Sequence, residues 1–175
     1  MDHATKHWVD HFVAGHDPHW MDRLTEHWSN LGEAGYGVPV LAAAAALVGW
    51  RLHSWKPLLA ALVAGLLLFV TVIPGKILIA RPGPLVEPVP DGDWGWFPSG
   101  HTATSAICFG TAALLLARAW PRLRWFLYGA CSVVCLGVII GLLWHDYHWL
   151  LDIIASLCLT GLILWTTTRL LPKRD

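Results

Sequence analysis

His148 and Asp152, late in the chain, have the spacing of a catalytic pair. His145, His148 and Asp152 are spaced i, i+3 and i+7, so an α-helix would project them from one stripe. An aspartate four residues after a histidine can accept a hydrogen bond from one ring nitrogen and leave the other nitrogen unprotonated. The residues His148 and Asp152 are therefore candidates for an activated nucleophile or base.

A second candidate group surrounds the tetrapeptide Pro98-Ser99-Gly100-His101, which precedes a long run of apolar and small residues. This pattern predicts a loop that opens a helix, with His101 in the first turn. Free backbone N–H groups and the helix dipole favour an anion there, and His101 could donate a proton beside it. Together the two groups offer what phosphoryl transfer requires: a nucleophile, hydrogen-bond donors for the phosphoryl oxygens, and an acid for the leaving group.

The elements that must position these residues are transmembrane helices. Hydrophobic residues make up 55% of the 175-residue chain and charged residues 14%, a balance that favours a membrane protein over a soluble one. Five apolar segments approach the ~20 residues that a spanning helix needs, at 37–55, 57–80, 101–120, 124–145 and 148–171. We expect an all-α integral membrane bundle of about five transmembrane helices, covering 37–175.

Residues 1–36 differ from this bundle in their pattern. Apolar residues recur at helical spacing on one face, while carboxylates and a histidine lie on the other, which predicts an amphipathic segment along the membrane surface. His3, His7 and His11 are also spaced by four, so they could bind a metal ion or form a solvated helical face. We expect no cleaved signal peptide, because no basic stretch precedes an apolar one.

The distribution of basic residues predicts the orientation of the helices. Eight of the 12 lysines and arginines lie in the 51–56 loop, the 118–124 loop and the C-terminal tail, or beside them, so that side is expected to be cytoplasmic. The 81–100 loop and the 145–152 turn then share the outer face of what we expect to be a bacterial inner membrane, with the site on the periplasmic or extracellular side.

Polar groups at helix ends indicate function because they are expensive in a membrane, and the outer face gathers many: Lys76, Arg81, Ser99, His101, His145, Asp146, His148 and Asp152. The zero formal net charge gives no basic field for nucleic acid. The four cysteines lie within apolar runs and are interpreted as small buried apolar residues.

Three motifs resemble the signature of the type 2 phosphatidic acid phosphatase family, which shares its site with vanadium haloperoxidases. The stretches "KILIARPGP" at 76–84, "PSGH" at 98–101 and "HWLLD" at 148–152 follow the order of the family motifs K-x6-RP, PSGH and SR-x5-H-x3-D. The resemblance covers roughly residues 57–171. It implies a membrane lipid phosphatase that forms a phosphohistidine and requires no metal or cofactor.

The resemblance also implies roles for individual residues. His148 would be the nucleophile, oriented by Asp152, and His101 would protonate the leaving oxygen. Phosphoryl oxygens would be bound by Lys76, Ser99 and the Gly100 backbone.

Both arginine positions of the family signature hold other residues. After the six residues that follow Lys76 the chain has Gly83-Pro84, and the Ser-Arg pair falls on Gly141-Leu142. Arg81, two residues early, and His145 are candidate replacements that would bind phosphate. Arg81 could instead be an interfacial arginine whose charged end reaches water, and His145 could support the site without binding phosphate or merely lie at the interface.

The leading hypothesis is hydrolysis of a lipid phosphate or diphosphate, such as a polyprenyl diphosphate, phosphatidate or phosphatidylglycerol phosphate. The same site could instead transfer the phosphoryl group, or ionise an allylic diphosphate and guide its cyclisation. Two further alternatives are a non-catalytic phospholipid-binding protein and a metal site formed by His101, His145, His148 and Asp152. Substrate headgroup, chain length and oligomeric state are not predicted.

Overall fold

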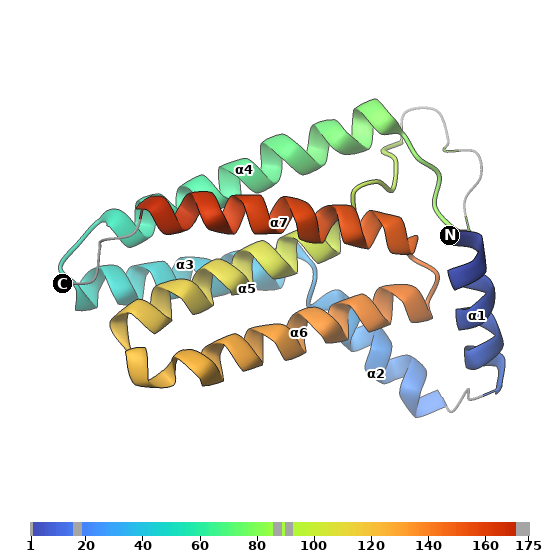
Figure 1. Cartoon of the computed structure of the whole chain (residues 1–175), viewed down its shortest axis with the longest axis horizontal. Helices are drawn as coiled ribbons and strands as arrows, with labels where there is room; N and C mark the ends of the chain where they lie inside the picture. Colours follow the sequence, from blue (N-terminus) through green and yellow to red (C-terminus); the bar gives the residue numbers. More distant parts are fainter. Residues whose placement is uncertain (1, 16–18, 86–88, 90–92, 171–175) are drawn as a thin grey trace.

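The computed structural model describes residues 2–15, 19–85, 89 and 93–170, and they form a bundle of helices (Figure 1). The elements in chain order are α1 (Asp2–Gly15), α2 (His19–Asn30), α3 (Ala34–Arg51), α4 (Lys56–Ile79), α5 (Gly100–Ala119), the short 3-10 helix η1 (Pro121–Leu123), α6 (Arg124–Trp144) and α7 (Leu150–Leu170). The described residues include no strand. The prediction of an all-α fold is confirmed.

The long helices are apolar enough to cross a membrane. Helices α4, α5 and α7 and the run Pro121–Trp144 are each long and apolar enough to span a membrane. Helices α2 and α3 together form a fifth candidate span, which is bent by 52° at the break between them. The five expected apolar segments correspond to α3 to α7, and the protein is an integral membrane protein. The expected boundary at residue 37 falls inside α3, which begins three residues earlier at Ala34.

Helix α5 is the centre of the bundle, in contact with α3, α4, α6 and α7 (Figure 1). In α5, 72% of the 18-residue apolar stretch is buried, against 17% of the corresponding stretches in α4 and in the run that contains α6. The outer faces of α4 and α6 are therefore left for lipid. The burial follows from side-chain size, since α5 is rich in Ala, Gly, Ser and Thr, and small residues let helix backbones approach closely in a membrane.

The two N-terminal helices close the end of the bundle that holds the expected site. Helix α2 packs against α6, where Gly137 and Gly141 leave room for Trp28 and for the Thr25 and Ser29 turn. Helix α1 lies across the bundle end beside the end of α6 and the start of α7 (Figure 1). The chain start is thereby brought close to residues 145–152.

Candidate active site

The His148 and Asp152 side chains meet at the start of α7, as their spacing predicts. His148 Nδ1 lies 3.3 Å from Asp152 Oδ2, and the two side chains are 3% and 0% exposed. Asp152 Oδ2 also accepts a hydrogen bond from the Trp149 backbone N–H at 3.2 Å, while the Asp152 N–H donates to the Trp149 carbonyl. The bond from the Trp149 N–H to the Asp152 side chain is one half of a capping box. It holds the carboxylate at the helix start.

The surroundings of His148 favour its neutral form. Burial lowers the pKa of His148, and the hydrogen bond with Asp152 opposes this lowering only in part. A neutral imidazole that donates its Nδ1–H to Asp152 keeps an unprotonated Nε2. The geometry therefore provides a nucleophilic nitrogen at neutral pH.

The start of α5 is joined directly to the start of α7. Ser99 caps α5 by accepting a hydrogen bond from the Thr102 N–H at 3.3 Å, and the Ser99 N–H donates to the Asp152 carbonyl at 3.3 Å. Ser156 Oγ lies 3.0 Å from the Ser99 carbonyl and strengthens the same junction. Ser99 is fully buried, so its hydroxyl serves the helix cap in this structure.

A pocket of about 390 Å³ opens beside this junction. Among the residues that line it are Lys76, Trp94, Trp96, Gly100, His101 and His148. Lys76, in the last turn of α4, donates from Nζ to the Gly95 carbonyl at 3.1 Å, and the Trp96 ring meets His148 edge-on with centroids 5.4 Å apart. The pocket thus gathers two histidines, a lysine and a helix start, a set that suits a phosphoryl group.

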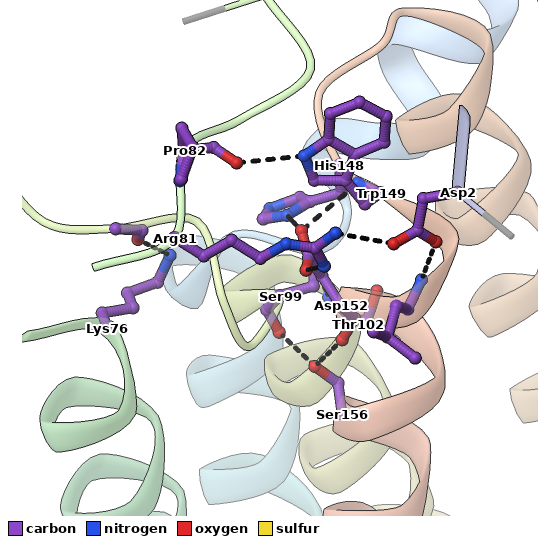
Figure 2. A network of polar contacts seen from close by, with 12 residues as sticks. Asp2, Lys76, Arg81, Pro82, Ser99, Thr102, His148, Trp149, Asp152 and Ser156 are labelled. Atoms are coloured by element: carbon purple, nitrogen blue, oxygen red, sulfur yellow. Dashed lines mark hydrogen bonds and ion pairs between the residues drawn. The ribbon is translucent and has the colours of Figure 1, made fainter. Parts of the chain in front are cut away.

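Arg81 points to carboxylates and is not among the residues that line this pocket (Figure 2). Its NH1 lies 2.6 Å from Asp152 Oδ1 and its NH2 lies 2.6 Å from Asp2 Oδ2. Burial by itself lowers the pKa of Arg81, but the bond to Asp2 and the charges of both carboxylates outweigh it and raise the pKa overall. Arg81 is therefore a fixed cation within an ion-pair network.

The sequence that forms this site matches a known protein family. The sequence model of the PAP2 superfamily matches residues 53–175. The chain belongs to the PAP2 superfamily. The resemblance predicted from the three motifs is confirmed, and all of the expected site residues lie within the matched range.

A solved structure shows the same fold. It is described as the first transmembrane PAP2 type phosphatidylglycerolphosphate phosphatase from Bacillus subtilis, with a TM-score of 0.80 over 95% of this chain and 83% of that chain. The two sequences are 21% identical, so this likeness concerns the fold. Comparison with curated protein sequences gives no significant match.

The Ser position of the third PAP2 motif, Gly141, is covered by α2, and the arginine position is taken by the buried Leu142. A Cβ atom on Gly141 would collide with the Thr25 carbonyl oxygen, so the close approach of α2 depends on glycine there. His145, the candidate replacement, lies with Nε2 3.0 Å from Thr25 Oγ1 and stacks on Tyr147, and it is not among the pocket-lining residues. The structure therefore brings together His148, Asp152, His101, Lys76 and Gly100, and it places His145 apart from them.

Two acidic residues near this PAP2 site were not predicted from the sequence. Asp2 binds Arg81, and Glu33 lines the pocket beside His101. Neither stands in a motif, so no local signal could have identified them. Within the described parts of the chain, no cluster of three or more His, Cys, Asp or Glu side chains could hold a metal ion, and this includes the set at His3, His7 and His11.

Proposed function

We propose that this protein is a membrane lipid phosphatase that hydrolyses a lipid phosphate or diphosphate through a phosphohistidine on His148, without a metal ion. The observation that carries the proposal is the position of His148: its Nδ1 is held by Asp152 while its ring lines the same pocket as His101 and Lys76. Membership of the PAP2 superfamily supports phosphatase chemistry.

The residues suggest a two-step reaction. His148 Nε2 attacks phosphorus, the N–P bond forms and the P–O bond to the lipid breaks, while His101 gives its proton to the departing oxygen. Water then attacks the phosphohistidine with His101 as base, which releases phosphate and restores His148. Lys76 and the Gly100 N–H would stabilise charge on the phosphoryl oxygens throughout.

An apolar groove next to the pocket supports a lipid substrate. The groove has a volume of about 720 Å³, lies between α3, α4 and α5, and shares Lys76, Trp94, Gly100 and Thr104 with the phosphate pocket. Along α4 it extends from Lys76 to Leu58, about 27 Å at 1.5 Å per helical residue. Acyl or prenyl chains would lie in this groove with the phosphate at Lys76.

The main experiment is phosphate release by the purified protein in detergent from prenyl diphosphates, phosphatidate and phosphatidylglycerol phosphate, with and without chelator. The last substrate is included because the Bacillus subtilis protein of the same fold is described as a phosphatidylglycerolphosphate phosphatase. We expect chelator-resistant release from at least one of them. No release from any substrate, or full loss with chelator, would contradict the proposal.

We expect Gly65→Phe to select against long chains. Gly65 lines the groove with open space around it and stands 11 positions before Lys76, about 16 Å along the helix. An extended chain advances about 1.2 Å per bond, so sixteen carbons reach past Gly65 and eight carbons end before it. We expect kcat/KM for the sixteen-carbon phosphatidate to fall about tenfold, a loss of about 1.4 kcal/mol, and that for the eight-carbon form to stay within about twofold.

The matched control for this measurement is Gly161→Phe, an exposed position on α7 that also has open space around it. Equal losses for the two chain lengths in Gly65→Phe, or the same chain-length effect in Gly161→Phe, would count against the groove as the chain site.

A second candidate reaction uses the aromatic side of the pocket. Trp94 and Trp96 line it, and aromatic faces stabilise cations, so ionisation of an allylic diphosphate with cyclisation is the competing chemistry. Product analysis by mass spectrometry separates the two, because hydrolysis gives the free alcohol alone. A cyclic or rearranged product would favour this candidate over hydrolysis.

We further propose that the site faces outward from a bacterial inner membrane and that the C-terminus is cytoplasmic. The basic residues at 51, 56, 118, 122, 124 and 169 lie at the opposite end of the helices from His148, as the positive-inside rule requires. Residues 1–36 would form the interfacial segment and 37–175 the phosphatase bundle. A reporter enzyme fused to the C-terminus and active only outside the cytoplasm would remain inactive; an active fusion would reverse the proposed orientation.

A further inference from the structure

Arg81 lies between two carboxylates that come from opposite ends of the chain (Figure 2). Asp152, in the first turn of α7, binds one guanidinium nitrogen, and Asp2, at the start of α1, binds the other, both at 2.6 Å. The second oxygen of Asp2 accepts a hydrogen bond from the Leu151 N–H at 3.1 Å. The Asp2 side chain, 11% exposed, thus bridges Arg81 and the helix that carries Asp152.

The two oxygens of Asp152 have separate partners. Oδ1 faces Arg81, while Oδ2 faces His148 and the Trp149 N–H. Rotation of the carboxylate would break the contact with Arg81, so Arg81 keeps Oδ2 directed at His148. The guanidinium in turn keeps its place because Asp2 holds its other nitrogen.

Asp2 also affects the charge that His148 experiences. Arg81 paired with Asp152 alone would form a neutral pair and offset part of the field of the carboxylate at His148. With Asp2 present, the three groups carry a net charge of −1, since 1 − 2 = −1 with both carboxylates ionised. Asp2 therefore restores the negative charge that Arg81 would otherwise neutralise beside His148.

We propose that Asp2 is a positioning residue of the active site, which holds Arg81 on Asp152 and maintains the negative charge that Asp152 presents to His148. This inference rests on the proposed function, because it assigns His148 as the nucleophile. Helix α1 then completes the site from the N-terminal end of the chain, and Arg81 acts through Asp152 and not by binding phosphate.

The docking of α1 has other contacts, which allow the charge of Asp2 to be tested separately. Lys6 Nζ lies 2.7 Å from Asp146 Oδ2, and the His3 ring meets Trp149 edge-on at 5.1 Å between centroids. Asp2→Asn is nearly the same size and keeps one acceptor oxygen, enough for either the Leu151 N–H or Arg81, but removes the negative charge. Glu at the same position restores the charge.

The decisive measurement is the pH profile of kcat/KM, whose acid limb reports protonation of the free nucleophile. Besides Asp2, the charged or titratable groups around His148 are Lys6 from α1, Glu33 ahead of α3, Lys76 from α4, His101 from α5, Asp146 after α6 and Asp152 from α7, and none of them changes in Asp2→Asn. Loss of a negative charge disfavours the imidazolium, so the pKa of His148 falls and the acid limb moves to lower pH. We expect a shift of about 0.5 pH unit, and a fall in kcat of about threefold because nucleophilicity follows basicity.

A variant of α1 serves as the control. Asp10→Asn removes an exposed carboxylate whose ion pair is with Lys6. It is expected to keep the wild-type acid limb, and Asp2→Glu is expected to return it. A simple loss of folded protein would lower kcat without moving the limb.

The same shift can be followed without turnover by NMR titration of His148, assigned with His148→Asn, in detergent micelles. A lower pKa in Asp2→Asn than in the wild type and in Asp10→Asn supports the inference even if no substrate is hydrolysed, an outcome that would overturn the proposed function alone. An unchanged acid limb or an unchanged His148 titration in Asp2→Asn overturns the role of Asp2.

Discussion

His148→Ala is expected to reduce phosphate release by about 10⁴-fold or more, close to the level of a preparation without enzyme. The substitution removes the atom that would form the covalent bond to phosphorus, and no other described histidine takes its place on Asp152. Asp152→Asn, which leaves the imidazole in place without its charged partner, is expected to cost about 10² to 10⁴-fold. The measurement is single-turnover and steady-state phosphate release from the best substrate of the panel.

A trapped intermediate distinguishes loss of the nucleophile from loss of folded protein. Acid-labile phosphate from radiolabelled substrate should appear on the wild-type chain and be missing from His148→Ala. The matched control is His27→Ala, an exposed histidine of α2 that should keep wild-type turnover and labelling. Label that persists in His148→Ala would assign the covalent step to another residue.

Gly141→Leu is expected to give the largest loss of stability. A side chain at residue 141 meets the Thr25 carbonyl oxygen and the Ser29 backbone, which cannot rotate away as a flexible side chain would. Helix α2 must therefore move off α6, at a cost of about 3 kcal/mol, the upper part of the usual range for overpacking. Thermal unfolding of the purified protein in detergent, followed by circular dichroism, measures the effect.

The control is Gly129→Leu, on the same helix at an exposed position with open space around it. Both changes improve helix propensity equally, so the difference in their melting temperatures reports the contact between α2 and α6. Melting temperatures that agree would mean that α2 does not require glycine at residue 141. Gly141→Leu should also disturb His145, whose Nε2 contacts Thr25 Oγ1 on the displaced helix.

Local pattern was sufficient to predict the helices and the pair at the centre of the site. The apolar segments correspond to α3 to α7, because a helix must be long and apolar to cross a bilayer, and hydropathy measures this property directly from the sequence. The contact between His148 and Asp152 followed from their spacing by one helical turn, and the start of α5 followed from a turn-forming loop ahead of a run of apolar and small residues.

The partners of Arg81 and His145 were decided by the tertiary structure. Both residues were expected to bind phosphate because they lie near the motifs in sequence, yet Arg81 lies on Asp2 and Asp152 and His145 lies on Thr25. Their places depend on how α1 and α2 fold back over the ends of α6 and α7. Periodicity relates residues within one helix, whereas these contacts join positions separated by more than 70 residues, and only the packing of whole helices brings them together.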